Sequence, residues 1–302
     1  IDKIKKNHFH PALKTKLPKR LTIEKFKNLA GIIKNADIIV GAVSSPGIDW
    51  FANVLLKNYK KNHKIVLLTK GLSISQGKVI TLTDKIKKIF TTNGIKNINI
   101  SAIKGPCLAA ELANRVRTGT VIANSKIKNA KYLQKIISTE YYSTEISNDI
   151  RGVELSGAIK NIYSMLIGAS EGLSSSYIAR NNEKKYYNNT AASLIHRSIS
   201  EMSNFVKKFG GKSETVYGLA GLGDLYVSVI GGRNSQMGKY LGEGYLFKNA
   251  KRKFMKKTTV EGAQLAKEIG PTIFRKLKRK NFPLMFNLLN TICKNKKLNI
   301  NW

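Results

Sequence analysis

A lysine and an asparagine stand inside an otherwise apolar segment, Gly152-Val153-Glu154-Leu155-Ser156-Gly157-Ala158-Ile159-Lys160-Asn161. The apolar residues recur at roughly helical spacing, so the segment predicts a helix with a buried face. Gly157 costs about 1 kcal/mol relative to alanine inside a helix, and it indicates that something packs closely there. Lys160 would lie at the edge of the buried surface, where desolvation lowers its pKa and makes it usable as an acid or base. The alternative is a lysine whose stem covers the core while its charge reaches solvent.

A second segment joins a glycine-rich turn to groups that could act beside such a lysine. Gly218-Leu219-Ala220-Gly221-Leu222-Gly223 precedes Asp224, and Ser228 follows four residues later. If this stretch is helical, Ser228 lies on the same side as Asp224. Asp224 can also be explained as an acid that caps a helix after a glycine turn.

Together these two segments resemble the glycerol-3-phosphate dehydrogenases. The resemblance extends through Thr69-Lys70-Gly71, through Gly105-Pro106-Cys107-Leu108-Ala109-Ala110-Glu111 and through Val260-Glu261-Gly262, all in the family's order. It covers most of the chain from about Leu17 onward. It implies an enzyme that uses NAD or NADP to interconvert sn-glycerol 3-phosphate and dihydroxyacetone phosphate, and that feeds phospholipid synthesis.

The resemblance also assigns roles to individual positions. It implies that Lys160 is the catalytic acid/base, that Lys70 is a second lysine at the substrate, and that Asp224 orients or balances a lysine. Two neighbouring ammonium groups lower each other's pKa, which would help Lys160 to work near neutral pH. The predicted substrate-binding residues are Lys70, Gly105, Cys107, Asn161, Asp224, Ser228, Gly232, Arg233 and Asn234. The predicted cofactor contacts are Lys70, Ala109, Arg233 and Glu261.

A phosphate ester is bound best by a planar guanidinium together with neutral donors, a need that Arg233 and Asn234 fit. Glu261 would hydrogen-bond a ribose in the family's pattern, although by itself it reads as an acid in the first turn of a helix. Cys107 stands where the family usually has Ser or Thr, and Gly232 replaces a frequent serine. Cys107 precedes a predicted helix and could be a nucleophile, but no histidine lies nearby in sequence.

The composition is strongly basic, with 53 Lys and Arg against 18 Asp and Glu and a formal net charge of +35. The lysines are spread along the whole chain, with no aromatic-interleaved basic stripe, so we expect no specific nucleic-acid partner. Two cysteines and four scattered histidines lack metal-ligand spacing, which predicts no metal. No apolar run approaches the roughly 20 residues of a membrane helix, and a cytoplasmic location is expected.

The first half alternates strands and helices, which predicts an α/β Rossmann-like parallel sheet with ligands at the carboxyl ends of its strands. The expected strands are Ala36 to Val43, Lys64 to Thr69, Ile98 to Ile103, Thr120 to Ala123 and Tyr142 to Ile146. The expected helices are Ile48 to Tyr59, Lys78 to Phe90 and Lys126 to Ser138, followed by Val153 to Leu173, Ala191 to Phe209 and Glu261 to Ile269. Ser174 to Asn189 reads as an inserted surface loop.

We therefore expect two domains, a partial NAD(P)-binding domain over residues 1–148 and a helical substrate domain over 149–302. No G-x-G-x-x-G turn precedes Ala36, and the glycines from 218 to 223 lack the βαβ context of a cofactor loop. By resemblance the family's first strand, glycine loop, helix and second strand are absent, so the chain is interpreted as N-terminally truncated. Two alternatives stay open, a related hydroxy-acid or alcohol dehydrogenase and an inactive basic binding protein. A homodimer is a further expectation.

Overall fold

The computed structural model describes residues 2–178 and 187–300, which form two compact units. Unit 1 comprises Ile1–Thr69, Thr83–Ile103 and Cys107–Asn148. Unit 2 comprises Lys70–Leu82, Lys104–Pro106 and Asp149–Trp302. Two short pieces of the first half of the chain thus belong to the same unit as the long helices of the second half.

Unit 1 is built on a five-stranded sheet in the order β3-β4-β7-β8-β9. Its strands are β3 (Ile38–Gly41), β4 (Lys64–Leu67), β7 (Asn99–Lys104), β8 (Thr118–Ala123) and β9 (Tyr142–Ser147). The pairs β3·β4, β4·β7 and β8·β9 are parallel. The Asn124 side chain, directly after β8, donates to the Ile100 carbonyl at the start of β7 (3.0 Å), so the carboxyl end of β8 lies beside the amino end of β7.

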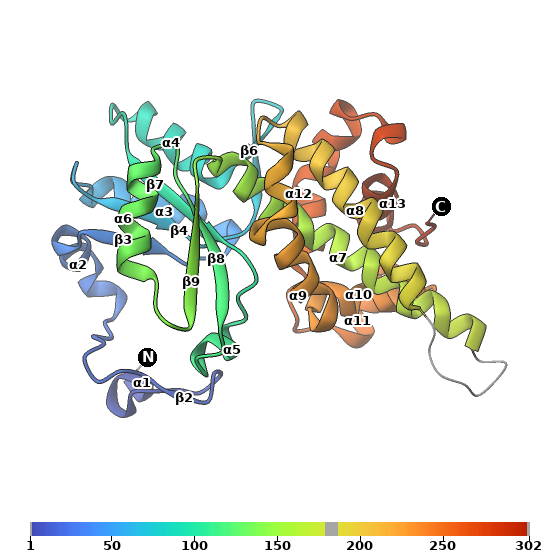
Figure 1. The fold of residues 1–302 in the computed structure, drawn as a ribbon, viewed down its shortest axis with the longest axis horizontal. Coiled ribbons are helices and arrows are strands. Elements are labelled where there is room, and N and C mark those ends of the chain that lie inside the picture. Colours follow the sequence, from blue (N-terminus) through green and yellow to red (C-terminus); the bar gives the residue numbers. More distant parts are fainter. Residues whose placement is uncertain (1, 179–186, 301–302) are drawn as a thin grey trace. The chain divides into compact units, whose positions relative to one another are not determined.

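The helix α6 (Ile127–Ile137) covers part of this sheet because it buries an apolar face. Ala130 and Leu133 of α6 pack on Val66, Ile103 and Ile122 of three neighbouring strands, and Figure 1 shows α6 alongside the sheet. The other helical elements of this half are α1 (Asp2–Asn7), η1 (Phe26–Asn28), α2 (Leu29–Asn35), η2 (Ser45–Gly47), α3 (Ile48–Asn58), α4 (Leu82–Thr92) and α5 (Ala109–Ala113). A small antiparallel pair, β1 (Phe9–His10) and β2 (Thr15–Lys16), lies near the start of the chain.

The prediction of one helix from Lys78 to Phe90 is wrong in its first turn. Residues Leu72–Ser75 (β5) and Lys78–Thr81 (β6) form an antiparallel hairpin, and α4 begins only at Leu82. Gln76 and Gly77 between the strands have φ of 50° and 67°, as a two-residue hairpin turn requires. The β-branched run in β6 favours a strand over a helix.

The described residues of unit 2 are mostly helical, and its strand residues include this hairpin and Lys104 at the end of β7. Its elements are α7 (Ile150–Ile178), α8 (Asn188–Lys208), η3 (Ser213–Tyr217), the π-helical turn η4 (Leu219–Gly223), α9 (Asp224–Gly231), α10 (Arg233–Gly242), α11 (Phe247–Phe254), α12 (Glu261–Lys276), η5 (Arg279–Asn281) and α13 (Pro283–Cys293). The long helix α7 is central, and α8, α9, α10 and α12 pack around it (Figure 1). Its residues Ile159, Ile162 and Leu166 are fully buried in the apolar core of the unit.

The prediction of a loop from Ser174 to Asn189 is wrong at both ends, because α7 continues to Ile178 and α8 begins at Asn188. The rest of that prediction, residues 179–186, lies outside the described residues. The contact between α7 and α10 is unusually close. A Cβ on Gly238 of α10 would lie 1.9 Å from the Met165 carbonyl oxygen of α7, so only glycine allows this approach. The backbone of α7 is thereby fixed close to the middle of α10.

Candidate active site

Lys160 lies within unit 2 on α7, and its side chain is buried rather than directed to solvent, with the residue 4% exposed. Its Nζ donates to Asp224 Oδ1 at 2.8 Å and to the Asp224 carbonyl at 3.4 Å. Burial and, secondly, the charge of Lys70 lower the pKa of Lys160 from its ordinary value to about 8, against the opposing attraction of Asp224. An ammonium with this pKa can give up and regain a proton near neutral pH.

Asp224 is the carboxylate that two lysines share. Its Oδ1 pairs with Lys160, and its Oδ2 lies 2.6 Å from the Nζ of Lys70. Asp224 is the first residue of α9 and follows the π-helical turn η4. Within that turn a Cβ on Gly221 would lie 2.0 Å from the Val216 carbonyl oxygen, so the glycine permits the close turn that precedes the aspartate. The glycine-rich segment is therefore a scaffold for Asp224.

Ser228 lies one helical turn after Asp224, as its spacing predicts. Its hydroxyl donates to the Asp224 carbonyl at 2.8 Å and accepts a hydrogen bond from Lys160 Nζ. The serine thus joins the lysine to the first turn of α9, and the ammonium has a hydroxyl partner as well as a carboxylate partner.

Lys70 lies shortly after β4 and Gly105 directly after β7, and both residues belong to unit 2. The Lys70 side chain, 30% exposed, reaches Asp224 and donates a long hydrogen bond of 3.5 Å to the Gly105 carbonyl. Gly105 has φ of 141°, a conformation that favours glycine. The backbone oxygen of Gly105 is therefore turned toward the second lysine of the site.

Asn161 and Asn234 are bonded to each other, with Nδ2 of Asn234 donating to Oδ1 of Asn161 at 3.1 Å. Oδ1 of Asn234 in turn accepts from the Gly262 backbone N–H at 2.8 Å. Both asparagines are buried. This amide chain connects α7, the start of α10 and the start of α12. It fixes the orientation of the Asn161 side chain, and Asn161 directly follows Lys160 in the sequence.

Arg233 and Glu261 form an ion pair between the first residues of α10 and α12. The side chains are 57% and 38% exposed, so both remain accessible to a ligand. Gly232 precedes Arg233, and a Cβ there would lie 2.3 Å from the Ser228 carbonyl oxygen. Glycine at 232 therefore lets α10 begin immediately after α9, with Arg233 close in sequence to the Asp224–Ser228 turn.

Two predicted residues, Cys107 and Ala109, belong to unit 1 instead. Cys107 is half-buried, and Ala109 is the exposed first residue of α5. Within the described parts of the chain, no group of three or more His, Cys, Asp or Glu side chains could hold a metal ion.

Sequence reasoning missed two ionisable residues of unit 2, Lys104 and Glu154. Both are almost fully buried, at 2% and 1% exposed. Glu154 lies in the segment that carries Lys160, while Lys104 is the last residue of β7. The available signal was Gly157, because a Cβ at that position would meet the stem of Lys104 at 3.1 to 3.4 Å. The close packing that this glycine predicts is therefore confirmed, and its partner is a lysine.

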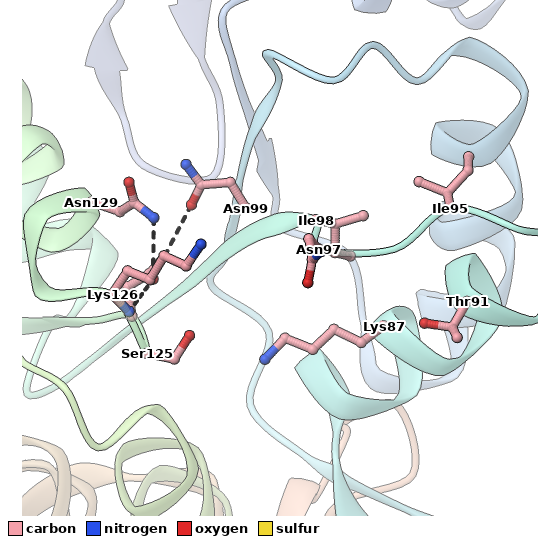
Figure 2. A pocket seen from close by; sticks show the side chains of 10 residues that line it. Lys87, Thr91, Ile95, Asn97, Ile98, Asn99, Ser125, Lys126 and Asn129 are labelled. Carbon is pink, nitrogen blue, oxygen red and sulfur yellow. Dashed lines mark hydrogen bonds between the residues drawn. The ribbon is translucent and has the colours of Figure 1, made fainter.

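A separate cavity of about 340 Å³ lies in unit 1 and is shown in Figure 2. Its lining includes Lys87 and Thr91 on one side and Ser125, Lys126 and Asn129 on the other. The amide of Asn124, also in its wall, is engaged by Ser101 and the Ile100 carbonyl. None of the residues predicted for the active site lines this cavity.

An α/β sheet unit and a helical unit that holds a buried lysine–aspartate pair are the parts expected of a two-domain dehydrogenase of the Rossmann type. Family models agree. The NAD-dependent glycerol-3-phosphate dehydrogenase N-terminus matches residues 1–130, and the C-terminus of the same family matches residues 149–300. The chain belongs to the NAD-dependent glycerol-3-phosphate dehydrogenase family.

Relatives and solved structures are consistent with this assignment. The chain is 33% identical over 273 residues to glycerol-3-phosphate dehydrogenase [NAD(P)+] of Mesoplasma florum, covering 89% of this chain and 76% of the relative. It is 32% identical over 237 residues to the NADP(+)-dependent enzyme of Archaeoglobus fulgidus, covering 78% and 67%. The glycerol-3-phosphate dehydrogenase structure from Coxiella burnetii shares the fold, with a TM-score of 0.81, 24% identity and coverage of 98% and 85%.

The predicted fold class is confirmed by this structural neighbour and by the parallel pairs of the sheet. Among the helices that the structure describes, none has the length and apolar character needed to cross a membrane.

Proposed function

We propose that this chain interconverts sn-glycerol 3-phosphate and dihydroxyacetone phosphate with NAD or NADP, and so supplies glycerol 3-phosphate for phospholipid synthesis. The observation that carries the proposal is the buried ion pair of Lys160 and Asp224, in which a lysine with a pKa of about 8 is held by a carboxylate and a hydroxyl. Membership of the glycerol-3-phosphate dehydrogenase family supports the choice of substrate.

Lys160 acts as the acid in the reduction of the ketone. Negative charge develops on the carbonyl oxygen as the carbonyl carbon is reduced, and a positioned ammonium both stabilises that charge and delivers the proton. Asp224 Oδ1, at 2.8 Å from Nζ, favours the protonated lysine and fixes its direction. In the oxidation of the alcohol the neutral amine takes the proton back. Ser228, bonded to the same Nζ, holds the amino group of Lys160 in place in both directions of the reaction.

Lys70 contributes a second positive charge at the reacting end. It shares Asp224 with Lys160, so the two ammonium groups repel each other and the charge of Lys70 lowers the pKa of Lys160. A substrate oxygen that gains negative charge is therefore met by two cations that are balanced by one carboxylate. This arrangement favours the charged transition state over the neutral ketone.

Arg233 is the proposed phosphate-binding residue. Its guanidinium is half exposed at the start of α10, and Glu261 holds it without burying it. A guanidinium can make two parallel hydrogen bonds to a phosphate, which an ammonium cannot reproduce. Asn161 and Asn234 hold the starts of α10 and α12 beside Lys160 through their mutual hydrogen bond, and their remaining amide capacity is available to the substrate.

The residues of unit 2 fit one end of a nicotinamide dinucleotide. The exposed carboxylate of Glu261 is an acceptor suited to a ribose hydroxyl, and Arg233 beside it suits a phosphate or a ribose oxygen. When bound, the nicotinamide supplies or accepts the hydride. Cys107, Gly105 and Ala109 are proposed as further contacts of substrate and cofactor on the basis of the family motif alone.

A substrate panel tests this proposal. The chain should oxidise NADH or NADPH with dihydroxyacetone phosphate, and should turn over dihydroxyacetone, pyruvate and 2-oxo acids far more slowly, because only the first carries a phosphate for Arg233. Faster turnover of an unphosphorylated ketone or a 2-oxo acid would assign the site to another dehydrogenase reaction. A cytoplasmic location and a homodimer stay predictions.

A further inference from the structure

Lys104 is a buried ionisable residue that the proposed mechanism does not use. It is the last residue of β7, it is 2% exposed, and yet it carries an ammonium group. A buried charge is costly unless other charges or hydrogen bonds compensate for it. The groups that face it therefore indicate why the position holds a lysine.

The stem of Lys104 lies across α7 at Gly157. A Cβ on Gly157 would be 3.1 Å from Cδ, 3.2 Å from Cγ and 3.4 Å from Cβ of Lys104. Gly157 is three residues before Lys160 and three residues after Glu154, so all three share one face of the helix. Lys104 thus lies along the same stripe of α7 that carries the proposed acid.

Three ionisable groups act electrostatically on Lys104, and a fourth is bonded to one of them. Glu154 of α7 attracts the ammonium, Lys70 repels it, and Asp224 at the start of α9 attracts it more weakly. Lys160 lies on the same helix and is bonded to that Asp224. Burial, first of all, lowers the pKa of Lys104 to about 8, and Glu154 limits the fall. Lys104 therefore belongs to the same electrostatic cluster as the site.

Its place in the chain also matters. Gly105, whose carbonyl accepts from Lys70, directly follows Lys104. Packing of the Lys104 stem on Gly157 ties the end of β7 to α7, and so fixes the Gly105 carbonyl with respect to Lys70. The cluster of Lys70, Lys104 and Lys160 with Asp224 and Glu154 holds three potential positive charges against two negative ones. Glu261 also attracts Lys160, but its charge is balanced by Arg233. A phosphate ester anion would restore the balance.

We propose that Lys104 is a positioning residue of the substrate site, a buried cation that anchors the Gly105 turn on α7 and strengthens binding of the anionic substrate whenever it is protonated. This inference rests on the proposed function. The substrate chemistry that it serves is a small phosphate ester anion, and the reacting proton remains with Lys160.

The test compares wild type with Lys104→Met, Lys104→Arg and the control Lys78→Met between pH 7 and pH 9.5. Lys78 is an exposed residue of β6 in the same unit, so its removal subtracts one positive charge without touching the cluster. Binding of sn-glycerol 3-phosphate is measured by calorimetry, and kcat and KM for dihydroxyacetone phosphate are measured in parallel. Thermal unfolding reports whether each variant is folded.

We expect Lys104→Met to weaken binding and raise KM about tenfold at pH 7, equivalent to about 1.4 kcal/mol, with kcat changed less than about threefold. Wild-type affinity should fall as pH rises through about 8, because Lys104 loses its charge there, and Lys104→Met should show a smaller fall. Lys104→Arg keeps its charge at every pH tested. Its affinity for sn-glycerol 3-phosphate should therefore fall less between pH 7 and pH 9.5 than the affinity of wild type does. Lys78→Met should resemble wild type.

A merely structural role for Lys104 predicts losses in both variants that do not depend on pH, and that result would overturn the inference. Unchanged affinity and pH dependence in Lys104→Met would overturn it as well. If Lys104→Met does not fold, the Lys104→Arg profile decides, since a fall in affinity parallel to wild type would contradict the proposal. These outcomes are separate from failure of the proposed function, which would appear as preferential turnover of an unphosphorylated substrate by the wild-type chain.

Discussion

Asp224→Asn should change the pH at which the enzyme works more than it changes the shape of the site. Asparagine keeps the size of the side chain but removes the negative charge that lies 2.8 Å from Lys160 Nζ and 2.6 Å from Lys70 Nζ. The carboxylate and Lys160 are both nearly buried, at 3% and 6% side-chain exposure, so solvent screens their interaction little. Without it, desolvation and the charge of Lys70 lower the pKa of Lys160 unopposed by Asp224.

The size of the effect can be estimated from the distance. Two unit charges at this separation attract by about 6 kcal/mol at an effective dielectric constant of about 20. If roughly half survives relaxation of the site, the pKa of Lys160 falls by about two units, from about 8 toward about 6. At pH 7.5 the protonated fraction would then fall from about three quarters to about 3%, a loss of about 25-fold in the reduction of dihydroxyacetone phosphate.

The sign follows from the direction of the reaction. Reduction needs the protonated lysine, so activity is present below the pKa of Lys160 and is lost above it. The ratio of Asp224→Asn to wild-type kcat/KM should rise toward one as the pH is lowered from 8 to about 5.5. Both enzymes are measured at each pH by the oxidation of NADH or NADPH, which removes the effect of substrate protonation from the ratio.

Asp49→Asn is a matched control, because Asp49 also pairs with a lysine (Lys85, 2.8 Å) but is 59% exposed. An exposed pair contributes little, so this variant should have the wild-type profile. A ratio for Asp224→Asn that stays constant from pH 5.5 to pH 8 would refute the reasoning, since Asp224 would then act without setting the proton affinity of Lys160.

Two other substitutions test the site and its scaffold. Arg233→Lys should raise KM for dihydroxyacetone phosphate by roughly tenfold or more with little change in kcat, because the ammonium cannot make a bidentate phosphate contact; equal kcat/KM for glycerol and its 3-phosphate would remove Arg233 from the phosphate site. Gly238→Ala should destabilise unit 2 by about 3 kcal/mol or more, because its Cβ would lie 1.9 Å from the Met165 carbonyl oxygen; denaturant unfolding measures this, and Gly231→Ala, where nothing lies within 4 Å of the added carbon, is the control.

The strands of the sheet were predictable because buried parallel strands are short apolar runs that end at turn residues. The expected strands Ala36 to Val43 and Lys64 to Thr69 contain β3 and β4. The hairpin of β5 and β6 was missed because Val79 and Ile80 lead without a break into an amphipathic helix. The two-residue turn at Gln76-Gly77, flanked by alternating residues, was the signal that could have separated them.

The site was predictable where one motif holds its residues, and less so where tertiary packing decides. Lys160 and Asp224 could be found because a lysine in an apolar helix and an acid after a glycine turn are unusual in themselves. Lys104 carries no such mark, since a lysine at the end of a strand is usually solvated. Its burial follows from contact with Gly157, a residue 53 positions later in the chain, and no local pattern encodes which side chain fills the space over a helix glycine.

The role of Lys160 is tested most directly by the turnover of dihydroxyacetone phosphate by wild type and by Lys160→Met at the same NADH or NADPH concentration. Methionine keeps the bulk of the buried side chain and removes only the ammonium group. We expect kcat to fall by roughly 10² to 10⁴, as for loss of a general acid, while the affinity for sn-glycerol 3-phosphate falls much less. Near-normal kcat in a folded Lys160→Met variant would contradict the assignment of Lys160 as the acid and, with it, the proposed mechanism.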